Sequence, residues 1–256
     1  MFYFITLQFT DSRILDTRCM ATYKTKAIIL SSYPYKEHDR IISFFSENYG
    51  RMEARARGTR KIESKLAGHL EPFIETELLL AHGKHWDILA GSRTLEPAQI
   101  LRSQLELSSL AALCSEAVKL ITRFNAPDAR IFRILKNTFS LLEDERLTLA
   151  HKRSLGISFL WQMLAIAGFT PELTRCIHCR NAAENGAFSF EGGGILCPNC
   201  ANHDLFAISL SSGLVAELRT KSLSDSREVR QVVIGFWRQV VDYAELRSWK
   251  FLEVIS

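Results

Sequence analysis

Two spacings of apolar residues divide the chain near Pro97. Between residues 22 and 97, short apolar segments alternate with turn residues and helical periodicity is weak, which is typical of β-strands. We expect strands over residues 24–31, 40–45, 51–56, 73–80 and 86–90, and we expect Tyr33-Pro34-Tyr35 to end the first of them. Short strands without long helices between them predict a small closed barrel of the OB type, with an SH3-like barrel as the alternative.

From Pro97 onward the apolar residues follow a helical period. They recur at three- to five-residue steps, which predicts helices over residues 101–124, 127–142 and 149–167. Asp225, with Glu228 three residues later, predicts the N-terminal cap of another helix that runs to Val241. The predicted fold class is α+β, with an OB-type β-barrel over residues 20–98 and an α-helical domain over 99–256 that carries a four-cysteine zinc insertion at 173–204.

The four cysteines of this insertion have the spacing of a metal site. Two C-x2-C pairs, separated by seventeen residues, place Cys176, Cys179, Cys197 and Cys200 in the insertion. Four thiolates can close tetrahedrally around Zn²⁺, and they leave no open position for water, so we expect a structural zinc ion. A disulfide or redox pair is the alternative, but no export signal indicates an oxidising compartment. We interpret His178 and His203, which lie beside the pairs, as surface residues.

Positive charge is concentrated in one segment of the predicted barrel. The formal net charge is only +4, yet the fifteen residues from Arg51 to Lys65 contain six Lys or Arg and two Glu. Arg51, Arg55 and Arg57 alternate along an expected strand, so they should project from one face. Each guanidinium can donate two forked N–H bonds to phosphate oxygens, which favours a DNA-binding surface. The alternative is a solvated edge strand whose charges only prevent aggregation.

Aromatic residues near the basic segment are candidates for stacking against unpaired bases. Tyr33 and Tyr35 are the stronger candidates, because Phe44 and Phe45 would point to opposite faces of a strand and at least one of them should be buried. The chain has no nucleophile motif, no phosphate-binding glycine loop and no carboxylate pair spaced for acid and base chemistry. We therefore expect no catalytic residues, no enzyme activity and no small-molecule substrate.

The first nineteen residues form a doubtful leader. Residues 1–9 are apolar but no basic stretch precedes them, and charged residues follow soon afterwards, which argues against a secretory signal. We expect translation to begin at Met20. Charged residues interrupt every apolar run before it reaches the length of a membrane span. With 47% hydrophobic and 23% charged residues, we expect a globular cytoplasmic protein associated with the nucleoid.

The chain resembles the RecO family of bacterial DNA repair and recombination mediators from about Tyr23 to Phe251. The resemblance rests on the opening KTKAIILSSYPYKEHDRIISFFSENYG, the basic RARGTRKIESKLAGHLEPF, the four-cysteine insertion and the closing LRSWKFL. It implies an N-terminal OB barrel and a helical domain with a zinc-bearing insertion. It also implies a protein that binds single- and double-stranded DNA, anneals complementary strands and, with the partner RecR, helps to load RecA onto DNA coated by single-strand-binding protein.

The resemblance also assigns roles to individual residues. The family's basic barrel surface falls on Arg51, Arg55, Arg57, Arg60, Lys61 and Lys65, with Lys36 and Arg40 as weaker candidates. The family docks the acidic, aromatic tail of single-strand-binding protein on its helical domain beside a cation and an apolar pocket, and our candidates are Lys152, Arg153 and Met163. Trp249 stands where members often have a basic residue, so one expected charge is missing.

Two other classes of function stay open at this point. One is a zinc-containing scaffold for protein interactions that does not bind DNA directly. The other is a nucleic-acid enzyme whose catalytic groups are dispersed along the sequence. Salt-dependent binding to DNA distinguishes the mediator from the scaffold, because phosphate contacts weaken steeply as salt rises.

Overall fold

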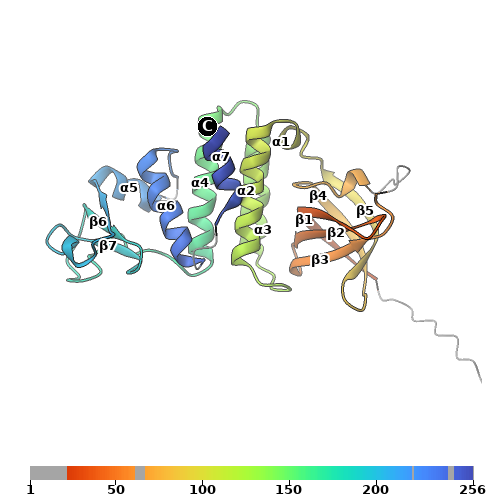
Figure 1. Ribbon diagram of the computed structural model, residues 1–256, viewed down its shortest axis with the longest axis horizontal. Coiled ribbons are helices and arrows are strands. Elements are labelled where there is room, and N and C mark those ends of the chain that lie inside the picture. The colour runs from red at the N-terminus through yellow and green to blue at the C-terminus, as the bar shows by residue number, and fades with distance from the viewer. Residues whose placement is uncertain (1–21, 61–66, 221, 242–244, 256) are drawn as a thin grey trace, which may run out of the picture.

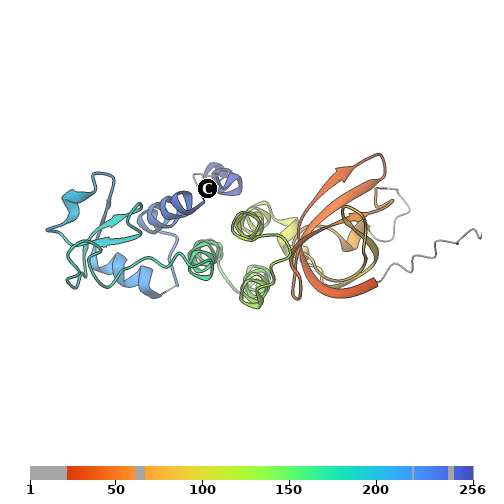
Figure 2. The ribbon, with the colours of Figure 1, turned by 90° about the horizontal axis from the view of Figure 1, so that it is seen from below.

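The computed structural model describes residues 22–60, 67–220, 222–241 and 245–255. A β-barrel lies at one end of the elongated molecule, a small β-sheet lies at the other end, and helices fill the space between them (Figures 1 and 2). The leader before Met20, together with Lys61 and Lys65, lies outside the described residues. Within the described part of the chain, no helix is long and apolar enough to cross a membrane.

The barrel is formed by the N-terminal strands. They are β1 (Thr22–Tyr35), β2 (Asp39–Ser46), β3 (Gly50–Ala56), β4 (Glu75–Ala81) and β5 (Asp87–Glu96), and they close in the order β1-β2-β3-β5-β4. Neighbouring strands are antiparallel except for β3 and β5, which pair in parallel. A closed barrel with this order confirms the OB-type fold predicted from the sequence.

Strand β1 is longer than we predicted, because it continues through Tyr33-Pro34-Tyr35. Its register against β2 shifts between Ile29 and Ser31, where a bulge lets the strand bend. The first half of β1 pairs with β4, while residues 31–35 pair with β2 alone among the described strands. A strand with one free edge accepts proline, whose missing N–H would leave a gap in a central strand.

Side chains of β1 and β2 point alternately into two apolar clusters. Ile29 and Phe44 belong to the cluster inside the barrel, whereas Ile28 and Phe45 belong to a larger cluster that continues through the helices. Both phenylalanines are fully buried, so neither one is a stacking platform for a base. Burial of alternate residues on both sides of the same strands attaches the barrel to the helical domain.

The helical domain is built from α1 (Gln99–Ser103), α2 (Leu105–Ile121), α3 (Ala129–Glu143), α4 (Leu149–Ile166), α5 (Ser212–Thr220), α6 (Arg227–Val240) and α7 (Arg247–Ile255). The single helix predicted over residues 101–124 is divided, because Gln104 is extended, with φ −111° and ψ 125°. Cys114 is fully buried on α2.

Two helix starts differ from simple sequence patterns. The cap of α6 is Ser226, not Asp225, and its hydroxyl accepts a hydrogen bond from the Val229 N–H at 3.2 Å. The start of α7 is capped from α2, because the Glu116 carboxylate accepts hydrogen bonds from the backbone N–H groups of Arg247 and Ser248. This second cap joins residues far apart in the chain and has no local sequence signature.

The small sheet at the far end consists of β6 (Gly186–Ser189), β7 (Gly194–Leu196) and β8 (Ile208–Leu210), in the order β7-β6-β8. It packs on α6 through Phe188, whose ring lies edge-on to Phe236 at 5.4 Å. Two short 3₁₀ turns, η1 (Ala67–His69) and η2 (Ala201–His203), complete the described secondary structure.

Side-chain and backbone contacts of Arg51 fix the barrel against the helices at the start of β3. Arg51 donates a hydrogen bond to the Lys119 carbonyl oxygen, and its guanidinium lies 4.0 Å from the centre of the Phe124 ring. The Asn125 N–H donates to the Arg51 carbonyl at 2.9 Å. Gly50, with φ 71°, leads the chain into this junction, where a side chain would meet the backbone of residues 126 and 127.

We predict that Gly50→Ala destabilises the protein by at least about 2 kcal/mol, because alanine is strained at this positive φ and its Cβ would overlap the Ala126 carbonyl. Urea unfolding measures the loss. The matched control is Gly68→Ala, because a Cβ at Gly68 meets no heavy atom within 4 Å, and its effect should stay within about 0.5 kcal/mol. Equal stabilities of the two variants would contradict the packing at this junction.

Candidate metal centre and nucleic-acid interface

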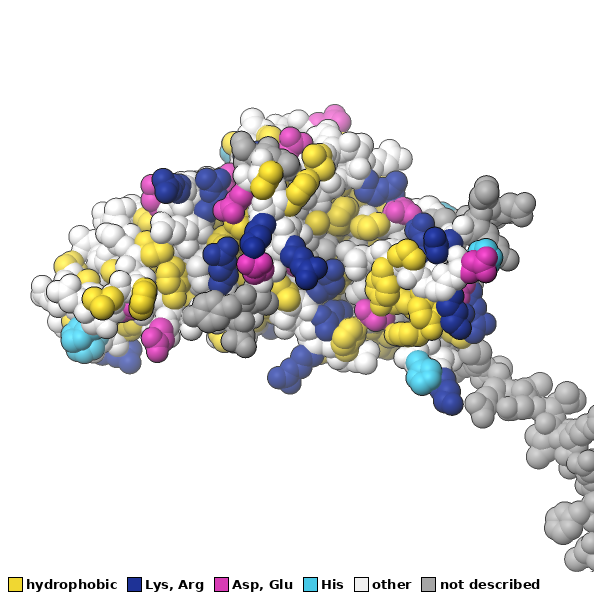
Figure 3. All heavy atoms as spheres, in the orientation of Figure 1, with side chains coloured by type: hydrophobic (Ala, Val, Ile, Leu, Met, Phe, Trp, Pro, Cys, Tyr) yellow, Lys and Arg dark blue, Asp and Glu magenta, His cyan; other side chains and the backbone are white. Residues whose placement is uncertain are grey.

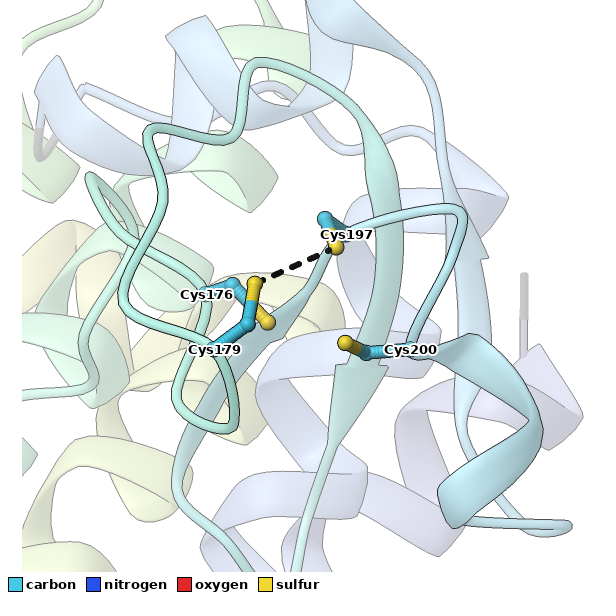
Figure 4. Close-up of side chains that lie close together, drawn as sticks. All are labelled: Cys176, Cys179, Cys197 and Cys200. Carbon is cyan, nitrogen blue, oxygen red and sulfur yellow. Dashed lines mark hydrogen bonds between the residues drawn. The ribbon is translucent and has the colours of Figure 1, made fainter.

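The four predicted cysteine ligands point toward one another beside the small sheet (Figure 4). All four are free thiols, and their sulfur atoms lie within 4.8 Å of one another. The Cys179 and Cys197 sulfur atoms are 3.7 Å apart. A tetrahedral ion with Zn–S bonds of about 2.3 Å places its sulfur atoms about 3.8 Å apart, whereas a disulfide bond is about 2.05 Å long. The cluster therefore has the geometry of a metal site and not of a disulfide.

Two backbone turns bring the thiols together. In the first, the Cys176 carbonyl accepts a hydrogen bond from the Arg180 N–H at 2.9 Å, and Arg180 adopts a positive φ of 65° to close the turn. In the second, which follows β7, the Cys197 carbonyl accepts from the Cys200 N–H at 2.9 Å. Backbone hydrogen bonds therefore close both turns.

The electrostatic surroundings of the thiols are unequal. Burial opposes ionisation of Cys176, but backbone N–H donors, led by that of Cys179, outweigh it and lower its pKa to about 6. Burial and then hydrogen bonds with the other thiols raise the pKa of Cys200 to about 12. One thiolate therefore forms readily, while four thiolates need a cation to neutralise their mutual repulsion.

The two histidines beside the cysteines are exposed, and their rings stack at 4.0 Å. His178 Nδ1 lies 3.6 Å from the Cys200 sulfur, and ligand atoms of His178, His203 and Cys200 lie within 4.8 Å of one another. Their rings are nearly parallel, with an interplanar angle of 16°, whereas ligands of one ion converge on it. The four cysteines are therefore the better ligand set.

On the barrel, the predicted basic strand keeps its alternation but not its continuous row of cations. Ala54 and Ala56 face the barrel interior, and Arg55 lies on the outer face. Arg51, however, is engaged at the junction with Phe124. Arg40 is likewise paired, because its Nη1 lies 2.9 Å from a Glu71 carboxylate oxygen. Structural contacts thus occupy two of the cations that the sequence placed on the DNA surface.

Asp39 holds Arg55 in a fixed position. Its carboxylate accepts from Arg55 Nε at 2.7 Å and from the Gly58 N–H at 2.8 Å. The Gly58 hydrogen bond, and then the Arg55 guanidinium, keep the pKa of Asp39 below its ordinary value in spite of burial. A carboxylate that stays ionised ties β2, β3 and the turn after β3 together.

The remaining predicted cations surround this ion pair. Arg57 is exposed and makes no hydrogen bond or ion pair with the residues that the structure describes. Arg60 is also exposed, and it donates hydrogen bonds to the carbonyl oxygens of Lys36 and Glu37 in the β1–β2 turn. Lys36 itself is exposed. Figure 3 shows Lys and Arg side chains over the barrel end and over the middle of the molecule on one face.

The two predicted tyrosines have different environments. Tyr33 is exposed, and its hydroxyl donates to Glu53 at 3.5 Å. Tyr35 is partly buried, with the Arg55 guanidinium 5.4 Å and the Lys36 ammonium 5.7 Å from its ring centre. Its ring also meets Trp86 at 5.2 Å in an edge-on contact. We did not predict Trp86 as a binding residue, because the sequence placed it at the start of the strand expected over residues 86–90. In the structure it lies in the β4–β5 loop, just before β5 begins at Asp87. An aromatic residue in this loop of an OB barrel was the available signal.

The three candidates for the tail of single-strand-binding protein do not form one surface. Met163 is completely buried and Lys152 nearly so, because both point into the packed helices. Arg153 lines a cavity of about 510 Å³ together with Arg230, Trp249 and other residues. Arg153 therefore lines this cavity, whereas Lys152 and Met163 do not.

Comparison with family models covers both parts of the chain. A model described as "Recombination protein O N terminal" matches residues 20–98. A second model, "Recombination protein O C terminal", matches residues 102–234. The matched segments include the barrel and the four cysteines.

Curated relatives extend this similarity over most of the chain, and each bears the name DNA repair protein RecO. A protein of Dehalococcoides mccartyi is 32% identical over 226 residues, which cover 88% of this chain and 87% of that protein. A protein of Pelotomaculum thermopropionicum is 28% identical over 247 residues, covering 91% and 94%. A protein of a Roseiflexus species is 32% identical over 213 residues, covering 81% and 74%. The chain belongs to the RecO family of DNA repair proteins.

Proposed function

We propose that the protein is a recombination mediator that binds single- and double-stranded DNA and anneals complementary strands. With RecR, it helps to load RecA onto DNA coated by single-strand-binding protein, in the cytoplasm at the nucleoid. The observation that carries this proposal is the positively charged surface at the β1–β2 turn and the end of β3, which Lys36, Arg57 and Arg60 form around the fixed Arg55. Family membership supports the partners.

The proposed mechanism makes and breaks no covalent bond. Two DNA strands repel each other through their phosphates, and cations that neutralise some of those phosphates lower this barrier while counterions leave. Base pairing then joins the strands. The ion pair with Asp39 fixes Arg55 within the barrel, and the exposed Lys36 and Arg57 beside it are the cations available to phosphates.

We infer that Zn²⁺ occupies the four-cysteine cluster and stabilises the small sheet. Cys176, Cys197 and Cys200 are part of the same apolar cluster as Phe188 and Phe236. A bound ion would join both cysteine turns, and through them β7, to the core beside α6. With four thiolate ligands the ion has no open position for a substrate, so its contribution is to folding.

The cavity beside Arg153 is our proposed docking site for the acidic, aromatic tail of single-strand-binding protein. Trp249 and Leu252 form an apolar wall, and the charged residues of the lining are Arg153, Arg230, Asp225 and Glu253. Arg230 is partly neutralised by Asp225 at 3.3 Å, which leaves Arg153 as the cation for a terminal carboxylate. Trp249 thus contributes an apolar surface where many family members have a charge.

We predict that the double variant Lys36→Ala, Arg57→Ala binds oligo(dT) more weakly and anneals complementary oligonucleotides more slowly. Arg55 and Arg60 are left intact because they hold the turn and the ion pair. Two lost phosphate contacts should make the slope of log affinity against log salt shallower by roughly 1.4 for single strands. Fluorescence anisotropy at several salt concentrations measures this slope.

The matched control for this variant is Arg102→Ala, Arg227→Ala, which removes the same charge from exposed positions of the helical domain. Its salt slope and annealing rate should stay close to those of the unmodified protein. An equal loss in both double variants would show that binding follows net charge and not the barrel surface.

We expect the purified protein to contain about one zinc ion per chain, and Cys179→Ser to lose it. Cys179 is chosen because it is the exposed member of the cluster, so the substitution disturbs packing least. Metal content is measured by mass spectrometry, and hydrogen exchange should show lost protection around β6 and β7 with the barrel unchanged. Cys114→Ala, which removes a buried thiol outside the cluster, should keep its zinc. Full zinc content in Cys179→Ser would rule out this ligand set.

Arg153→Ala should weaken binding of a peptide with the acidic, aromatic C-terminal sequence of single-strand-binding protein by roughly tenfold, because a charge-assisted hydrogen bond contributes about 1.5–3 kcal/mol. Anisotropy of a labelled peptide measures this affinity. Arg146→Ala is the control, since Arg146 is exposed and pairs with Asp144 away from the cavity. Unchanged peptide binding in Arg153→Ala would place the docking site elsewhere.

A further inference from the structure

Trp86 differs from the other tryptophans of the chain. All four lie within the described residues, and Trp161, Trp237 and Trp249 are buried, with exposed fractions of 5%, 0% and 6%. Trp86 is partly exposed in the loop between β4 and β5, and it belongs to neither apolar cluster. Packing of the core therefore does not explain why this position carries the largest aromatic side chain.

The surroundings of Trp86 come from two other segments of the barrel. Its ring meets Tyr35, the last residue of β1, at 5.2 Å with an interplanar angle of 74°. Arg55 of β3 lies 5.4 Å from the centre of the same tyrosine ring, and Lys36 lies 5.7 Å from it. The rings of Trp86 and Tyr35 thus meet edge to face, and two cations lie beside the Tyr35 ring.

The ion pair between Asp39 and Arg55 holds this arrangement in place. The Asp39 carboxylate lies 2.7 Å from Nε and 2.5 Å from Nη2 of Arg55. Arg55 in turn lies against Tyr35 by a cation–π contact, which fixes the tyrosine ring that Trp86 meets. The rings therefore have a defined arrangement without a ligand, and a ligand that stacks on them loses little entropy to ordering them.

We propose that Trp86 and Tyr35 form a stacking platform for an unpaired nucleobase of single-stranded DNA. This inference rests on the proposed DNA-binding function and extends it to a specific contact and a strand preference. A base has an apolar face of the size of these rings, and its sugar carries a phosphate that the exposed Lys36 beside Tyr35 can neutralise. Bases inside a duplex are already stacked on their neighbours, so the platform favours single strands.

Stacking of this kind is compatible with annealing. A base that stacks on a ring uses its flat face, and its Watson–Crick edge stays open to a second strand. The platform would hold one strand by its backbone and at least one base face while the complementary strand pairs with the open edges. Recognition by stacking is also tolerant of sequence, because every base has such a face.

The experiment uses the full-length protein and oligo(dT), which does not pair with itself. Because the other three tryptophans are buried, a change of tryptophan fluorescence on binding reports mainly on Trp86. We expect oligo(dT) to quench this emission in the unmodified protein, and Trp86→Phe to lose the quenching. Trp86→Ala should bind oligo(dT) at least about fivefold more weakly, and Trp86→Phe less so because it keeps a ring. Affinity for a duplex of equal length should not change in either variant.

Anisotropy of labelled DNA separates failure of the platform from failure of DNA binding. If oligo(dT) binds without quenching, or if Trp86→Ala binds it as tightly as the unmodified protein does, the platform is wrong while DNA binding stands. An equal loss for single strands and duplex would overturn the strand preference. If the unmodified protein binds neither DNA at low salt, the proposed function fails and the platform fails with it. Circular dichroism of the variants verifies folding, which a partly exposed loop position should preserve.

Discussion

The alternation of side chains along β1 and β2 is the constraint on which the arrangement of the molecule depends. Ile29 and Phe44 fill the barrel, while Ile28 and Phe45 continue into the core of the helical domain. One face of the barrel is therefore covered by helices and unavailable to DNA. Outside this junction lie the β1–β2 turn, the end of β3 and the β4–β5 loop. These segments carry the exposed cations Lys36, Arg57 and Arg60 and the paired rings of Tyr35 and Trp86.

Some cations on this barrel are engaged in structural contacts, and others are exposed and available for the proposed DNA contacts. Arg51 attaches β3 to the helices, and Arg40 pairs with Glu71. Arg55 is held by Asp39 and supports Tyr35. Arg57, by contrast, reaches solvent. A guanidinium serves both purposes well, because it can stack on a ring and form forked hydrogen bonds. A count of cations in the sequence therefore overstates the number available to phosphate.

The cysteine cluster illustrates a different balance between local and distant interactions. Each C-x2-C pair makes its own turn through backbone hydrogen bonds, so the two halves of the site are local. Their meeting depends on the pairing of β6 with β7 and on the core beside α6. The thiols resist ionising together, with the pKa of Cys200 raised to about 12 by burial and by its thiol neighbours. A bound cation would remove that repulsion and couple metal binding to folding of the small sheet.

Local patterns in the sequence determined the class of the fold and the four cysteines that could hold a metal ion. A period of two residues marks strands, a period near 3.6 marks helices, and the cysteine pairs are recognised by spacing alone. These patterns predicted the barrel, the helical domain and the cysteine cluster that the structure shows.

Only the tertiary structure decided which charged and aromatic residues are available to a ligand. Arg51 lies on Phe124, Trp86 meets Tyr35, and Glu116 caps the distant start of α7. Met163 is completely buried in the structure. The sequence alone did not show this, because an apolar residue on a helix can face either the core or a binding pocket. The physical reason is that such contacts join segments far apart in the chain, and no short-range period or spacing encodes which distant surface will cover a side chain.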